Sequence, residues 1–134
     1  MKLIDANVIL RYLLREPPEQ AEQARAVIAA GAFTTMEVMA EVVYVLQKVY
    51  GVRREEISAA VMRVAGEVGI AEYDALSCAM ELFQTRNLDF VDCALAARSF
   101  VNGDEVFSFD KKLNAAIQEL DAEKKRLTNG NKLI

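Results

Sequence analysis

The chain has 134 residues, of which 53% are hydrophobic and 27% charged, a composition typical of one globular domain and unlike a disordered chain. It contains no histidine, which excludes Ser-His-Asp and Cys-His catalysis and most zinc sites. The formal net charge of −4 argues against a large basic surface for nucleic acid. However, a cluster of acids that binds divalent cations would by itself account for the negative net charge.

The sequence also bears on the compartment. No apolar run approaches the roughly 20 residues that a membrane span requires. Asp5, Asn7 and Arg11 interrupt any apolar core of a signal peptide, so we expect a cytoplasmic protein with no membrane partner. Cys78 and Cys93 lack a CxxC or other metal spacing, and small buried thiols in a reducing compartment are favoured over a disulfide.

The N-terminal stretch predicts a strand followed by a helix. The apolar pair Leu3-Ile4 stops at Asp5, and apolar positions resume at helical spacing after Asn7, which we predict to cap the helix. Ligands of open α/β sheets bind beyond the carboxyl ends of the strands, so Asp5 is a candidate site residue. The alternative is a turn residue whose side chain satisfies loop amides.

The rest of the chain alternates between helical and strand patterns. Further helices are predicted over 18–30, 35–50, 52–67, 73–84 and 89–100, with a short one after 110. Further strands are predicted over 32–34, 69–71 and 105–109. Thr34 and Glu37 have the spacing of a capping box. The order predicts a single α/β domain over residues 1–120 with a parallel central sheet of about four to five short strands, helices on both faces, and a polar, mobile C-terminal tail over 121–134.

Two helices carry acids beside apolar residues. Glu41 is the only charge between Val38 and Leu46, and burying a carboxylate requires a cation, hydrogen bonds or water. It also fits an ordinary solvated stripe, made by Glu37, Glu41, Tyr44 and Lys48. Asp89 and Asp92 begin another helix; we interpret Asp89 as its N-cap and Asp92 as the site acid, with the opposite assignment still open.

Asp110 ends the last predicted strand as Asp5 ends the first. Its alternative role is to cap the helix that begins at Lys111. Ser108 lies two residues earlier, on the same side of the strand, and is placed to hydrogen-bond a carboxylate or a metal-bound water. Clustered carboxylates repel one another unless a cation neutralises them, and oxygen ligands without histidine or thiolate favour Mg²⁺ or Mn²⁺. Such ions activate water for phosphodiester displacement.

Four segments resemble the motifs of PIN-domain ribonucleases, in the same order and with similar spacing from Met1 to about Leu120. They are Asp5-Ala6-Asn7, Glu41-Val42-Val43-Tyr44-Val45-Leu46, Asp92-Cys93-Ala94-Leu95-Ala96-Ala97 and Ser108-Phe109-Asp110-Lys111. The small size is similar to that of VapC-type toxins of toxin–antitoxin pairs. Cys93 departs from the more usual alanine, and the additional Asp89 obscures which residue is the third acid.

The resemblance implies a Mg²⁺- or Mn²⁺-dependent endoribonuclease that leaves a 5′-phosphate and a 3′-hydroxyl. Asp5 and Asp92 would bind the metal directly, while Glu41 and Asp110 would bind through water, complete a second metal site or orient the attacking water. Asn7 and Ser108 would hydrogen-bond the acids. The resemblance further implies a homodimer, an RNA substrate and inhibition by a small antitoxin protein.

Three functions other than that of a toxin endoribonuclease share some of these sequence features. A haloacid-dehalogenase-like phosphatase requires a second aspartate two residues after the first, where this chain has Asn7. A non-catalytic PIN domain that binds RNA or protein, and a PIN nuclease of RNA processing, stay open. The basic residues that could steer RNA are scattered and receive no individual role: Arg11, Arg15, Arg86, Arg98 and Lys111.

Overall fold

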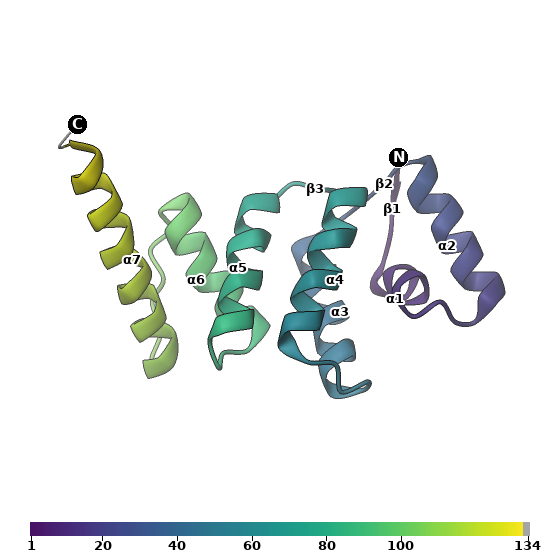
Figure 1. Ribbon diagram of the computed structural model, residues 1–134, viewed down its shortest axis with the longest axis horizontal. Coiled ribbons are helices and arrows are strands. Elements are labelled where there is room, and N and C mark those ends of the chain that lie inside the picture. Colours follow the sequence, from purple (N-terminus) through teal and green to yellow (C-terminus); the bar gives the residue numbers. More distant parts are fainter. Residues whose placement is uncertain (133–134) are drawn as a thin grey trace. The chain divides into compact units, whose positions relative to one another are not determined.

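The computed structural model describes residues 1–132, with the side chains of residues 1–129; the last two residues of the predicted tail lie outside the described part. The chain divides into two compact units, Met1–Tyr73 and Asp74–Ile134. The described residues form three strands and seven helices (Figure 1). None of these helices is both long and apolar enough to cross a membrane.

The first unit contains a parallel sheet in the order β1-β2-β3. Its strands are β1 (Lys2–Leu3), β2 (Ala32–Thr34) and β3 (Gly69–Ile70). Two helices follow each of the first two strands: α1 (Ala6–Leu14) and α2 (Pro18–Ala30), then α3 (Met36–Lys48) and α4 (Arg54–Glu67). Parallel neighbours require such crossover connections, which explains why strand and helix patterns alternate in the sequence.

Helix α3 forms the centre of the first unit. It contacts α1 and α4, and α1 in turn contacts α2 (Figure 1). Its buried side chains recur at helical spacing: Met36, Met39, Val42, Val43 and Leu46. Full burial of a side chain of this size contributes roughly 1.5–3 kcal/mol, so this apolar stripe is what holds the helix in place.

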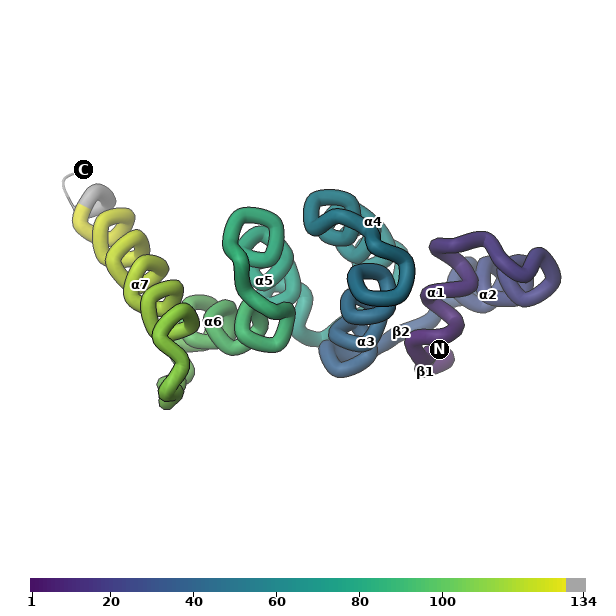
Figure 2. Tube along the Cα trace, turned by 90° about the horizontal axis from the view of Figure 1, so that it is seen from below, coloured from purple at the N-terminus to yellow at the C-terminus, as the bar shows by residue number. Residues whose placement is uncertain are grey.

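The second unit contains α5 (Tyr73–Thr85, which begins at the boundary), α6 (Phe90–Asn102) and α7 (Lys111–Lys132). Helices α6 and α7 lie side by side (Figure 2). The rings of Phe83 and Phe90 meet edge to face, with centroids 6.5 Å apart. Helix α7 is 22 residues long, so the prediction of a short final helix was wrong, and residues 121–132 are helical.

The last predicted strand, 105–109, is not a strand in the structure. A strand needs a neighbour that supplies backbone hydrogen bonds, and the described residues of the second unit contain none. Phe107 and Phe109 are exposed and contact each other edge to face, with ring centroids 5.2 Å apart. The described sheet therefore has three strands instead of the predicted four to five.

Two predicted helix caps are shifted along the chain. Helix α1 begins at Ala6, and its N-cap is Asp5 instead of Asn7, because the Asp5 carboxylate reaches the backbone N–H of Val8. Helix α3 is capped by Thr35, whose hydroxyl accepts from the N–H of Val38 at 3.3 Å. Thr34, the predicted first residue of a capping box, ends β2 with its side chain buried.

Candidate active site

Asp5 lies where β1 leads into α1. The backbone N–H of Ile4 donates to the carbonyl of Phe33 at 2.9 Å, which continues the pairing of β1 with β2 up to the residue before Asp5. Asp5 Oδ1 accepts from Val8 N at 3.1 Å, and Oδ2 accepts no hydrogen bond from any described residue. The exposed carboxylate thus caps the helix with one oxygen and leaves the other open to solvent.

Thr34 fixes the strand end that carries Asp5, a role that the sequence did not reveal. Its side chain is only 3% exposed, and its hydroxyl donates to the carbonyl of Ile4 at 3.1 Å. This bond ties the end of β2 to the residue immediately before Asp5. A threonine in a short strand is ordinary, so no signal in the sequence marked this contact.

A pocket of about 520 Å³ opens beside Asp5 between α1 and α2. Its lining residues are Asp5, Asn7, Val8, Arg11, Gln20, Gln23, Ala24 and Val27. Arg11 Nε donates to Gln20 Oε1 at 2.7 Å, which ties the guanidinium to the first turn of α2. The structure therefore brings Asn7 and one of the scattered cations, Arg11, to the candidate ligand Asp5.

Glu41 is exposed on α3. The side chains of Glu37, Tyr44 and Lys48 are exposed as well, so they form the solvated stripe expected from their spacing. The apolar neighbours of Glu41 point the other way, and its carboxylate stays in solvent without the cost of burial. Helix α3 contacts α1, the helix that Asp5 caps.

Two aspartates of the second unit affect the ionisation of a third, Asp92. Partial burial raises the pKa of Asp92, and the negative charges of Asp110 and then Asp89 raise it further. Asp89 is the N-cap residue of α6, but its side chain makes no capping hydrogen bond. Asp92 is the less exposed of the two helix-start acids, and it experiences the field of both other carboxylates.

Asp110 immediately precedes α7 and caps it, as Asp5 precedes and caps α1. Its Oδ1 accepts from the backbone N–H of Leu113 at 3.0 Å, and its Oδ2 has no partner among the described residues. The hydroxyl of Ser108 accepts from the backbone N–H of Asp110 at 3.0 Å. The backbone carbonyl of Ser108 accepts from the side-chain amide of Asn114 at 2.9 Å. Ser108 therefore orders the turn that presents Asp110 instead of bonding its carboxylate.

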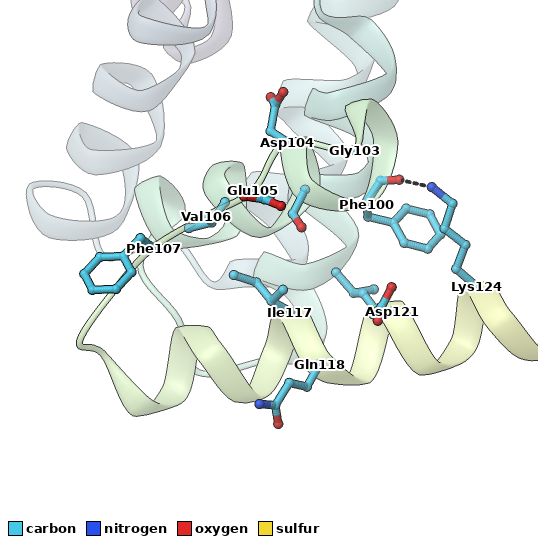
Figure 3. A pocket seen from close by; sticks show the side chains of 12 residues that line it. Phe100, Gly103, Asp104, Glu105, Val106, Phe107, Ile117, Gln118, Asp121 and Lys124 are labelled. Carbon is cyan, nitrogen blue, oxygen red and sulfur yellow. Dashed lines mark hydrogen bonds between the residues drawn. The ribbon is translucent and has the colours of Figure 1, made fainter.

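A larger cavity in the second unit, about 700 Å³, contains none of the candidate acids. It lies between the end of α6, residues 103–107 and α7 (Figure 3). Lys124 Nζ donates to the carbonyl of Phe100 at 2.9 Å and lies 5.5 Å from the centre of its ring. The lysine charge is thus held by this contact at the cavity wall.

The candidate acids suit a divalent cation in their chemistry. Within either unit, the described residues contain no group of three or more acids or thiols already close enough to hold a metal ion. However, Asp5 and Asp110 each keep an oxygen without a partner among the described residues, and the pKa of Asp92 is raised first by partial burial and then by the excess of negative charge from Asp110 and Asp89. A hard cation with oxygen ligands would relieve that excess.

Comparison with known protein families shows which family the chain resembles. The PIN domain family matches residues 2–118, a span that includes all four candidate acids, Asn7, Ser108 and Asp89. Among curated proteins, no sequence matches the chain.

Proposed function

The chain belongs to the PIN-domain family, whose members are generally nucleases, and on that premise we propose that it is a metal-dependent endoribonuclease. The observation that carries the proposal is the group Asp92, Asp110 and Asp89, in which partial burial and then the charges of Asp110 and Asp89 raise the pKa of Asp92. Repelling acids at the surface are destabilising by themselves. A site for Mg²⁺ or Mn²⁺ explains why a chain would retain them.

We assign the residues as follows. Asp5 and Asp92 bind the cation directly, and Glu41 and Asp110 bind it directly or through water. A bound hard cation activates water and stabilises the charge that develops in phosphodiester displacement. Asp5 and Asp110 are oriented by the helices that they cap. Thr34 and Ser108 order the backbone beside them, which keeps the ligand oxygens in a fixed direction.

The biological role proposed here is that of a VapC-type toxin, which a small antitoxin protein would inhibit and which would act as a homodimer in the cytoplasm. The support is the resemblance of the four motifs. Residues 1–120 would form the nuclease domain, with 121–134 as a polar C-terminal extension that begins within α7.

The decisive experiment measures cleavage of RNA by the purified protein with Mn²⁺ or Mg²⁺, followed by sequencing of the new RNA ends. We expect cleavage that EDTA abolishes and that leaves 5′-phosphates. Asp5→Asn and Asp92→Asn should each lower the rate by more than about 100-fold, beyond the range for residues that only support ligands. Wild-type rates in either variant would refute the ligand assignment.

Two control variants separate ligand loss from loss of charge or of helix stability. Asp104→Asn removes an exposed carboxylate of the second unit that has no hydrogen bond or ion pair among the described residues, and it should cut at the wild-type rate. Asp89→Asn should retain most activity. If Asp89→Asn were inactive and Asp92→Asn active, the roles of these two acids would be reversed.

A further inference from the structure

Two pockets of the first unit share one arginine. The pocket beside Asp5 includes Arg11, and a second pocket of about 560 Å³ is lined by Arg11, Leu14, Arg15, Glu16, Pro17, Pro18 and Tyr50. The two pockets adjoin at Arg11, and their lining residues extend from Asp5 along α1 and its C-terminal turn to Tyr50. We infer that this lining is a track for single-stranded RNA, an inference that rests on the proposed function.

The cations of the track are available to a ligand. Arg11 makes a hydrogen bond to the neutral side chain of Gln20 but forms no ion pair with any described residue. Arg15 is exposed and also has no ion pair in the described part of the chain. Arg25 is bound bidentately by Glu22 in a neighbouring pocket. Free guanidinium groups bind phosphates readily, so Arg11 and Arg15 are the phosphate contacts.

Tyr50 supplies an aromatic surface at the far end of the track. Its side chain is 54% exposed although it lies just after α3, where its backbone N–H donates to the carbonyl of Val45. Successive bases of a single strand stack on such rings, whatever their identity. A basic groove that ends at an exposed aromatic side chain is typical of binding to single strands.

The wall of the pocket beside Asp5 adds polar groups that distinguish RNA from DNA. The amides of Asn7 and Gln23 line it together with Gln20, and an amide can both donate to and accept from a ribose 2′-hydroxyl. Asp5 and Glu16 are the acids of the track. A bound cation would offset the charge of Asp5; in EDTA the carboxylates of Asp5 and Glu16 both oppose the phosphates, so metal-free binding depends on Arg11, Arg15 and Tyr50.

The test is a binding titration in EDTA. Fluorescence anisotropy reports the affinity of the full chain for a labelled RNA single strand over a series of salt concentrations, and a denaturing gel confirms that the RNA stays intact. Arg11→Gln and Arg15→Gln should each reduce the slope of log affinity against log salt by about 0.7. At about 0.1 M salt this corresponds to roughly fivefold weaker binding. Glutamine at position 11 keeps a partner for Gln20, so the contact between α1 and α2 is preserved.

Three further measurements complete the design. Tyr50→Ala should weaken binding about fivefold or more with the salt slope unchanged, because stacking releases no counterions. Arg53→Gln is the matched control, since it removes an arginine that is paired with Glu56 and lines neither pocket; it should bind as wild type. DNA of the same sequence should bind more weakly than RNA.

The outcomes separate this inference from the proposed function. Wild-type slope and affinity in Arg11→Gln, or an equal loss in Arg53→Gln, would overturn the track even if the protein cuts RNA. Equal binding of DNA and RNA would overturn the assignment of RNA. If Asp5→Asn and Asp92→Asn cut normally while the track variants behave as expected, only the ligand assignment fails.

Discussion

Asp5 has two proposed roles, and substitutions at this position can separate them. As the N-cap of α1, its Oδ1 accepts from Val8 N at 3.1 Å. As a proposed metal ligand, it contributes a negative charge and a second oxygen. Asparagine and serine preserve the cap acceptor but remove the charge, whereas alanine removes both. A series of three variants therefore distinguishes a structural aspartate from a catalytic one.

The expected stabilities follow from the cap geometry. Asp5→Asn retains an acceptor oxygen and loses only the attraction of a carboxylate for the helix N-terminus, about 0.3–1 kcal/mol. Asp5→Ser should behave similarly, because serine is an equally good N-cap. Asp5→Ala also loses the capping hydrogen bond, about 1 kcal/mol more. Urea unfolding followed by circular dichroism measures these differences as shifts of the midpoint with an unchanged slope.

The rate of RNA cleavage should depend on the charge at position 5 and not on the stability of the variant. All three variants are expected to lose more than about 100-fold in metal-dependent RNA cleavage, although only Asp5→Ala loses the cap. If Asp5→Asn and Asp5→Ser cut RNA at nearly the wild-type rate while Asp5→Ala did not, Asp5 would be a helix cap and the metal site would lie elsewhere. Measuring stability and rate on the same preparations makes that distinction direct.

Two other predictions concern the buried groups. Thr34→Val should lower the free energy of unfolding by about 1–3 kcal/mol, because the buried carbonyl of Ile4 loses its donor. The control Thr85→Val, at an exposed helical position, should change the free energy of unfolding by less than about 0.5 kcal/mol. Equal losses in the two variants would refute the role of Thr34. Burial raises the pKa of the Cys78 thiol, so Cys78 should react with a disulfide reagent only at a higher pH than free cysteine does. Cys93 is fully buried and should react only after unfolding. Fast labelling of both thiols at neutral pH would contradict these expectations. Because the shift favours the neutral thiol in the folded state, its small contribution to stability is present at neutral pH and is lost as the pH rises through the pKa of the folded protein.

Local patterns in the sequence were sufficient for most of the helices and for the parallel orientation of the strands. Residues 18–30 and 32–34 were predicted with the bounds that the structure has, because a proline start, a glycine end and an apolar stripe are properties of neighbouring residues. The PIN family was also recognisable, since its motifs are short segments around Asp5, Glu41, Asp92 and Asp110. Helix caps were less certain, because Asp5, Asn7, Thr34 and Thr35 are all good capping residues.

Tertiary structure decided the features that depend on contacts between residues distant in the sequence. Whether 105–109 becomes a strand depends on a neighbour that offers backbone hydrogen bonds, and no periodicity within the segment reveals this. The contact of Thr34 with Ile4 joins residues thirty positions apart, and the raised pKa of Asp92 depends on its partial burial and then on the charge of Asp110 across the turn before α7. The sequence by itself determined the residue types, the helices and the family, because these arise from local patterns. Only the folded chain determined which oxygens are free, which arginine lies beside Asp5 and which carboxylates repel, since those properties require atoms to meet in space.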